Sequence, residues 1–126
     1  MSQYWIVGAM FGGMDDQLAT FITRGYWYCW DPNKTRDREV PDSVQKLFPQ
    51  IRAGDRIAVK KMLGTGSKNI AVRALGIVTD VDHEEWRVYV NWVVPDLARE
   101  VPIHGCMGSI HGPFKVSEWR DSVFSV

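Results

Sequence analysis

The sequence predicts an α+β domain in which several strands form a curved, barrel-like antiparallel sheet with two or three short helices. Three observations lead to this prediction. The chain has 126 residues, which suits one domain spanning 1–126. Segments in which apolar residues alternate at period two dominate the second half of the chain. Short segments with helical spacing lie between the first strand and these later strands, so helices and strands are mixed along the chain.

The first expected strand covers residues 4–10, which are rich in aromatic and β-branched residues and precede two glycines. A short amphipathic helix is expected next, because apolar residues recur there at helical spacing. We expect Asp15 or Asp16 to cap its N-terminus and Gly25 to end it. Its apolar face consists of Leu18, Phe21 and Ile22.

The densest aromatic stretch of the chain, at 26–30, comes next and leads into a charged segment at 31–42. We expect this charged segment to be a loop, because it contains two prolines and charges of both signs. A second short helix is expected to start at Ser43, a favourable N-cap, and to stop before Pro49.

From Ala53 onward the pattern is typical of strands. Strands are expected at 56–61, 70–81 and 86–93, joined by turns at 64–69 and 82–85. Gly76, inside the long second strand, indicates a bulge or a close backbone approach. The remaining segments are expected to be a short strand at 101–103, a glycine-rich loop at 104–113 and a closing helix at 116–124.

Composition and charge exclude several classes of protein. Fifteen Lys and Arg residues balance fifteen Asp and Glu, which argues against binding of nucleic acid by charge alone. The apolar runs are far shorter than the about 20 residues that span a bilayer, and no basic start of a signal peptide is present. Cys29 and Cys106 are too few for a disulfide framework, so we expect free thiols and a cytoplasmic protein without membrane contact.

Three polar clusters resemble sites of chemistry but lack the required spacing. The glycine-rich run at 64–68 joins two strands and does not match a phosphate-binding loop. His104, Cys106 and His111 are too few and wrongly spaced for a structural zinc site. The carboxylates at 80–85 are typical of a solvated turn. We therefore expect no metal, no cofactor and no enzyme activity.

The six tryptophans outnumber both the tyrosines and the phenylalanines. Packing explains three of them, which are Trp5, Trp86 and Trp119. The other three are Trp27, Trp30 and Trp92. Two of these border the charged loop, where large aromatic residues often line pockets. Their planar rings would suit the stacking of a planar base.

Four motifs occur in a recognisable order. They are YWIVG at 4–8 with GYW at 25–27 after the helix, GDRIAV at 54–59, LGIVT at 75–79 and RVYVNWVVPDL at 87–97. Together they resemble the PUA-like superfamily, in the branch that contains the EVE and YTH domains. The resemblance extends from Tyr4 to about Ile103.

This resemblance implies a PUA-like fold with a pocket for a base. Trp27 matches the tryptophan that walls the pocket after the first helix, with Trp30 or Trp92 as the second wall. The end of the first strand matches the segment that contacts the base edge. YTH domains carry Lys-Ser there, whereas this chain has AMFGG at 9–13, so backbone groups, Asp15, Asp16 or Asn91 would contact the base. The expected base-pocket residues are Trp27, Trp30, Trp92, Met10, Phe11, Gly12 and Asn91. The expected phosphate contacts are Arg36, Arg38, Lys60, Lys61 and Lys68.

The resemblance also implies a function, the binding of nucleic acid through a flipped, methylated base, with DNA favoured over RNA. Similar domains occur beside motor ATPases or nucleases in bacterial restriction systems, so such a partner is expected. Two alternatives stay open. One is an RNA-binding or RNA-processing domain of the PUA or ASCH type, in which a hydrolase would use Lys60, Lys61 and Glu84. The other is an adaptor that binds proteins through exposed aromatic residues.

Overall fold

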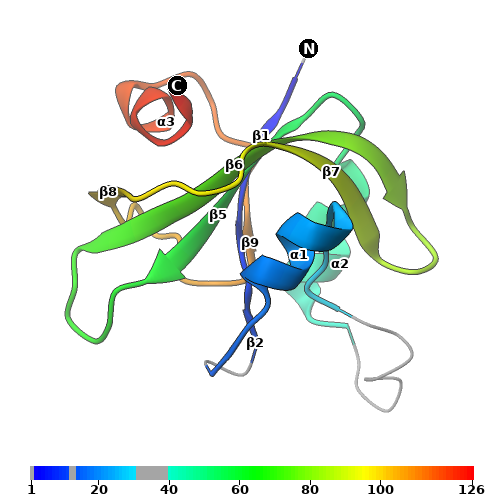
Figure 1. The fold of residues 1–126 in the computed structure, drawn as a ribbon, viewed down its shortest axis with the longest axis horizontal. Helices are drawn as coiled ribbons and strands as arrows, with labels where there is room; N and C mark the ends of the chain where they lie inside the picture. Colours follow the sequence, from blue (N-terminus) through cyan, green and yellow to red (C-terminus); the bar gives the residue numbers. More distant parts are fainter. Residues whose placement is uncertain (1, 12–13, 31–39) are drawn as a thin grey trace.

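The computed structural model describes residues 2–11, 14–30 and 40–126 and shows a curled sheet that forms a half-barrel with short helices (Figure 1). This confirms the predicted α+β class. The strands are β1 (Tyr4–Gly8), β2 (Met10–Phe11), β3 (Asp15–Asp16), β4 (Tyr26–Trp27), β5 (Arg56–Met62), β6 (Asn69–Asp82), β7 (Arg87–Val94), β8 (Arg99–Pro102) and β9 (Ile110–His111). The helices are α1 (Leu18–Arg24), α2 (Asp42–Leu47), α3 (Glu118–Phe124) and the 3-10 helix η1 (Phe48–Gln50). Within the described ranges, no helix is long and apolar enough to cross a membrane.

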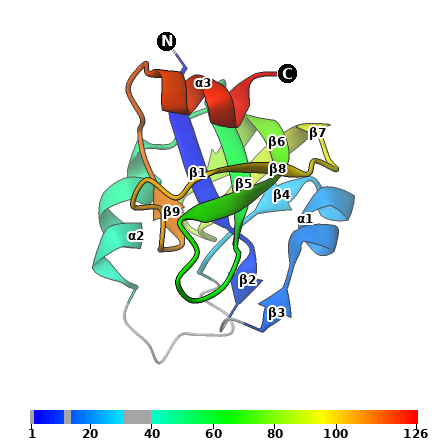
Figure 2. The same ribbon diagram turned by 90° about the vertical axis from the view of Figure 1, so that its left-hand side faces the viewer.

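The main sheet has seven strands in the order β4-β7-β6-β5-β1-β9, with β8 paired to β6. Its β1–β5 pair is parallel, from Tyr4 opposite Arg56 to Gly8 opposite Lys60, which departs from the antiparallel arrangement that the sequence predicted. A parallel pair needs a long crossover, and the chain from β2 to η1 supplies it. The two strands run side by side, with their carboxyl ends directed toward β2 and β3 (Figure 2).

Two hydrophobic cores lie on opposite faces of the sheet. Trp5 and Val7 of β1 pack in the first core, and Ile6 of the same strand packs in the second. Helices α1, α2 and η1 cover the first core, whereas α3 and β8 cover the second (Figure 1). Because both faces of β1 are covered, its sequence is a continuous apolar run without the alternation of a half-exposed strand.

Helix α1 begins later than predicted. Asp15 and Asp16, the predicted N-caps, form β3 against β2, and Gln17 precedes the helix. Asp16 still accepts a hydrogen bond at Oδ1 from the backbone N–H of Leu18, at 3.1 Å. Gly25 ends the helix as predicted, with a φ of 71° that glycine adopts without strain.

The later elements follow their predicted segments with shifts of a few residues. Helix α2 begins at Asp42 and not at Ser43, and Pro49 lies within η1. Ser117 caps α3, because its side chain accepts a hydrogen bond from the backbone N–H of Arg120. Strand β9 lies inside the predicted glycine-rich loop. A strand of two residues is too short for an alternating pattern to predict it. Strand β9 forms because it pairs with β1.

Gly76 marks a close approach of β6 and β7, as its place in a strand predicted. The register of β6 against β7 shifts between Leu75 and Gly76. A Cβ atom on Gly76 would overlap the side chain of Val90 and lie 3.0 Å from Cε3 of Trp92. The close approach of β6 and β7 at this position therefore requires a residue without a side chain.

Asp55 holds together the N-terminal ends of β1 and β5. Its side chain is 2% exposed, and Oδ1 accepts a hydrogen bond from Gln3 N at 3.0 Å. Oδ2 accepts three more, from Trp5 Nε1 at 2.9 Å, Arg52 N at 2.9 Å and Gln3 Nε2 at 3.1 Å. Four donors thus replace water around a buried carboxylate, so the GD motif has a structural role.

Candidate functional site

The carboxyl end of β1 meets the segment that follows α1. The indole Nε1–H of Trp27 donates a hydrogen bond to the carbonyl oxygen of Gly8, at 2.8 Å. Strand β4, which carries Trp27, is itself held by β7, with Tyr26 opposite Tyr89 and Trp27 opposite Val88. The two segments that the resemblance assigns to a base pocket therefore lie together, although 19 residues separate them in the chain.

The ring of Trp27 has no exposed surface and packs in the first core. This corrects the expectation of a ring that faces an open pocket. The physical reason is the packing around β4, because Trp27 lies opposite the buried Val88 of β7, and Tyr28 is buried in the same core. A base could stack on Trp27 only after the side chains that cover it move.

Four aromatic rings form a cluster beside this junction: Phe11, Phe21, Tyr26 and Tyr28. The ring of Tyr28 meets the other three edge to face, with centroids 5.3–5.8 Å apart. The guanidinium carbon of Arg87 lies 4.7 Å from the centroid of Tyr26 and 4.4 Å from that of Tyr28. Phe11, Tyr26 and Arg87 are half-buried, so the cluster reaches the surface.

Sequence reasoning named Phe11 but missed Tyr26, Tyr28 and Arg87. It selected tryptophans by side-chain type and did not ask which residues of the aromatic stretch share a face. The alternation within 26–28 was the available signal, since it places the first and third residues on one side of the strand. Arg87 contacts these rings because β4 pairs with β7, and a local sequence pattern does not show which strands pair.

The other predicted pocket residues of this region are only partly described. Met10 is half-buried on β2, opposite Asp16. Trp30 is half-buried at the end of the described segment 14–30. Gly12, Arg36 and Arg38 lie outside the described residues. Among the described residues, the half-buried rings of this region that pack against the first core are those of Phe11 and Tyr26.

Asn91 and Trp92 lie on opposite faces of β7. Trp92 packs against the first core, and its Nε1–H donates to the carbonyl oxygen of Phe21 at 2.9 Å. Asn91 is exposed, and its neighbours Val90 and Trp92 both face the first core, so its side chain points away from Trp27. The structure thus brings Trp92 to the face that carries Trp27 and separates Asn91 from it.

Two of the predicted phosphate contacts, Lys61 and Lys68, are exposed on the β5–β6 hairpin. Lys61 lies near Asp16. Burial alone would raise the pKa of Asp16, but hydrogen bonds and the charges of Arg73 and Lys61 lower it below its usual value. Arg73 Nη1 donates to Asp16 Oδ2 at 2.6 Å. The hairpin is therefore a local basic region that one carboxylate partly neutralises.

Lys60 departs from the expectation of a surface contact, because its side chain is only 6% exposed. Burial lowers its pKa, and burial together with the charge of Lys60 also lowers the pKa of His111. Burial raises the pKa of the Cys106 thiol, against an opposing effect of Lys60. Lys60 and His111 lie beside the 105–109 loop, which contains Cys106, whereas Glu84 is exposed in the β6–β7 turn. The residues named for a hydrolase are thus in different environments.

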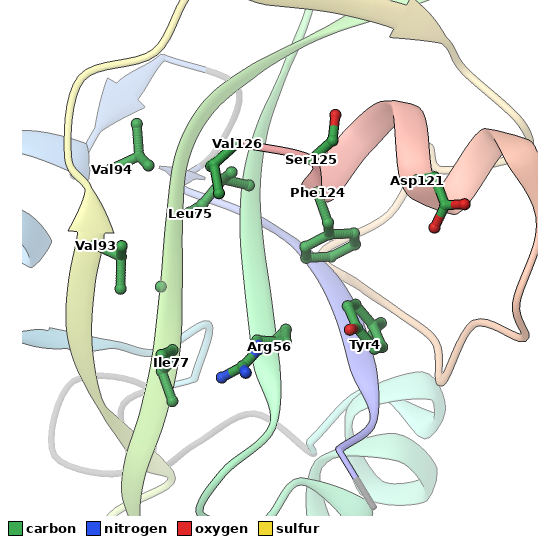
Figure 3. Close-up of a pocket in the computed structure, with 11 residues that line it drawn as sticks. Tyr4, Arg56, Leu75, Ile77, Val93, Val94, Asp121, Phe124, Ser125 and Val126 are labelled. Carbon is green, nitrogen blue, oxygen red and sulfur yellow. The ribbon is translucent and has the colours of Figure 1, made fainter.

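A cleft of about 400 Å³ opens on the other face of the sheet, between α3 and strands β6 and β7 (Figure 3). Its lining is mostly apolar. The rings of Tyr4 and Phe124 meet edge to face at 4.9 Å on one side, and Arg56 projects between Tyr4 and Ile77. The cleft is lined by none of the predicted base-pocket residues. It is therefore separate from the Trp27 site.

The described residues contain no group of three His, Cys, Asp or Glu side chains that could hold a metal ion. Comparison with known proteins adds no assignment, since no protein-family model matches the chain and no curated protein matches it significantly. What the site can do follows from its own geometry, which combines a buried indole, an aromatic cluster that reaches the surface at Phe11 and Tyr26, and a basic hairpin.

Proposed function

We propose that this chain binds nucleic acid and accommodates a flipped, modified base at the carboxyl end of β1. The observation that carries the proposal is the hydrogen bond from Trp27 Nε1 to the Gly8 carbonyl oxygen. It joins the two segments that the resemblance to EVE and YTH domains assigns to the base pocket. The ligand that we favour is DNA with a methylated base, bound in the cytoplasm beside a motor ATPase or nuclease.

Stacking supplies most of the binding free energy in this proposal. Extrusion of a base from a duplex costs a few kcal/mol, and each aromatic ring that stacks on a base contributes about 1–3 kcal/mol. Phe11 and Trp30 are the half-buried rings that we assign to this stacking. A methyl group adds apolar surface to the base and so strengthens the contact. Trp27 supports the site indirectly, because its hydrogen bond to Gly8 fixes the end of β1.

The neutral net charge limits the part that phosphate contacts play. Among the predicted phosphate contacts that the structure describes, Lys61 and Lys68 are exposed, and both lie on the β5–β6 hairpin. Two such contacts predict a slope of about −2 when the logarithm of the affinity is plotted against that of the salt concentration. Affinity should therefore depend on salt less steeply than in a basic DNA-binding protein.

The test is a fluorescence-anisotropy titration with short DNA duplexes that carry N6-methyladenine, 5-methylcytosine or no modification. We expect one modified duplex to bind at least about fivefold more tightly than the unmodified one. Trp30→Ala should weaken that binding about tenfold. Trp119→Ala is the matched control, because Trp119 is another half-buried tryptophan but lies on α3.

Two results would contradict the proposal. One is equal affinity for modified and unmodified duplexes, which would show that no pocket distinguishes the modified base. The other is an equal effect of Trp30→Ala and Trp119→Ala, which would show that Trp30 has no special contact with the ligand. Circular dichroism of each variant checks that the fold is retained.

A further inference from the structure

The cleft between α3 and strands β6 and β7 has the size of a small-molecule site. Its volume of about 400 Å³ lies near the lower end of the range of roughly 300–1,000 Å³ that small ligands occupy in proteins. The side chain of Val93 is 53% exposed beside it, so the walls retain apolar surface that a ligand would remove from water. The apolar walls consist of Leu75, Ile77, Val93, Val94 and Phe124 (Figure 3).

Contacts within the chain hold the aromatic wall of this cleft in place. The ring of Tyr4 meets that of Phe124 edge to face, and the guanidinium carbon of Arg120 lies 3.9 Å from the centroid of Tyr4. Helix α3 is joined to β8, because Trp119 Nε1 donates a hydrogen bond to the carbonyl oxygen of Pro102 at 2.9 Å. The wall is therefore formed before a ligand arrives, and binding costs little ordering of side chains.

Arg56 places a positive charge in this largely apolar lining. Its side chain is half-buried and projects between Tyr4 and Ile77 (Figure 3). Among the described residues, its guanidinium group forms no ion pair and no hydrogen bond. Water satisfies the N–H donors when no ligand is bound. A carboxylate can replace that water through two parallel hydrogen bonds, because its two oxygens match the guanidinium fork.

Asp121 limits the negative charge that a ligand can carry. It is the one carboxylate side chain among the described residues that line the cleft, and it forms no ion pair with Arg56. The side chains of the lining thus carry one positive and one negative charge. A single carboxylate can bind at Arg56, whereas a doubly charged phosphate monoester would also be repelled by Asp121. The lining therefore favours a monocarboxylate.

We propose that this cleft binds a small organic acid with one carboxylate and an apolar body the size of a fused two-ring system. The carboxylate accepts two hydrogen bonds from the guanidinium group of Arg56. The apolar body covers Val93 and Phe124. The proposal does not rest on base binding, because the cleft and the Trp27 site lie on opposite faces of the sheet.

A matched pair of probes tests the cleft directly. The probes are 2-naphthoate and 2-naphthamide, which share one apolar body and differ in charge. Binding is followed by NMR through the amide chemical shifts of the protein. We expect 2-naphthoate to bind with a Kd of about 0.1–1 mM and to shift the amides of Ile77, Val93 and Phe124. The neutral 2-naphthamide should bind about five- to tenfold more weakly.

Charge variants identify the group that holds the carboxylate. Arg56→Gln should weaken binding of 2-naphthoate about tenfold and leave that of 2-naphthamide almost unchanged. Arg52→Gln is the matched control, because Arg52 is an exposed arginine that does not line the cleft, and it should change neither affinity. Asp121→Asn removes the repulsive charge and should tighten binding of 2-naphthoate about twofold. The ratio of the two affinities remains informative in a variant of lower stability.

Three results would overturn the proposal. One is equal affinity of the wild type for the two probes, and another is the absence of amide shifts at the cleft with 2-naphthoate. The third is a dimer of the wild type in sedimentation velocity that Val93→Asp dissociates, because a second copy of the chain would then cover the cleft.

Discussion

Asp55 and Lys60 are both buried charged residues, and they lie at opposite ends of the same parallel strand pair. Asp55 is 2% exposed and Lys60 is 6% exposed. The carboxylate accepts four hydrogen bonds from three residues, whereas the ammonium group has no such partner among the described residues. The N-terminal end of the pair is thus held by hydrogen bonds within the chain, whereas the ammonium group of Lys60 is left to solvent.

This difference separates a charge that the chain satisfies from a charge that solvent satisfies. A buried charge that the chain satisfies itself fixes the positions of the strands around it. A charged group that reaches solvent is satisfied by water and does not hold the strands around it in this way. The carboxyl end also carries the junction of Gly8 with Trp27, and it is the end that we assign to ligand binding.

The largest expected effect comes from removal of the satisfied charge. Asp55→Ala leaves four donors without their acceptor and should lower the free energy of unfolding by about 3–5 kcal/mol. Urea denaturation measures this loss. Asp96→Ala is the control, because Asp96 is exposed, and its effect should stay within about 0.5 kcal/mol. Similar losses in the two variants would remove the distinction between the two ends.

Trp27→Phe should have a smaller effect, a loss of about 1–2 kcal/mol in the free energy of unfolding. The variant keeps an aromatic ring in the first core but leaves the carbonyl oxygen of Gly8 without its donor. Trp119→Phe provides a comparison, since Trp119 Nε1 donates to the carbonyl oxygen of Pro102 in an exposed setting. A larger loss for Trp119→Phe would mean that the Trp27 hydrogen bond does not hold β1 and β4 together.

Lys60→Met should act in the opposite direction and stabilise the protein without ligand by about 1 kcal/mol. Methionine fills a similar volume without the cost of a buried charge. Lys61→Met should change the free energy of unfolding by less than about 0.5 kcal/mol, because Lys61 is exposed. A clear destabilisation by Lys60→Met would show that the ammonium group is satisfied within the chain.

The smallest expected effect is a pH dependence near the same end. The pKa of His111 is below the unfolded value of 6.5, because of burial and of the charge of Lys60. The unfolded state therefore binds more protons just below pH 6.5, and stability should fall as the pH is lowered through that value. His111→Gln should remove this component of the pH profile of Tm, and Lys60→Met should reduce it. An unchanged profile in His111→Gln would assign the component to another group.

Local patterns predicted the elements well but not their partners. Strand β1, helix α1 with its end at Gly25, and the close approach at Gly76 were all available from residue types and spacing. The parallel pairing of β1 with β5 was not, because about 50 residues separate the strands and no local signal specifies the partner. Strand β9 likewise forms only through its contact with β1.

The site was predictable to the extent that it depends on residue type. The resemblance assigned the end of the first strand and the segment that contains Trp27 to one site, which stays a prediction; the structure shows a hydrogen bond between Trp27 and Gly8. The burial of Trp27 and of Lys60 depends on which face of a strand each residue takes once the sheet has formed. The sequence showed Asp55 only as a turn residue, because the three residues that donate to it, Gln3, Trp5 and Arg52, lie in two separate segments.

An amide chemical-shift map with a methylated DNA duplex tests most directly whether the carboxyl end of β1 and β5 binds the ligand. The account predicts the largest shifts at Gly8 and Phe11 and at the indole N–H of Trp30. It predicts little change at Gln3 and Arg52, which surround Asp55 at the other end. Shifts concentrated around Asp55, or an identical map with the unmodified duplex, would contradict the account.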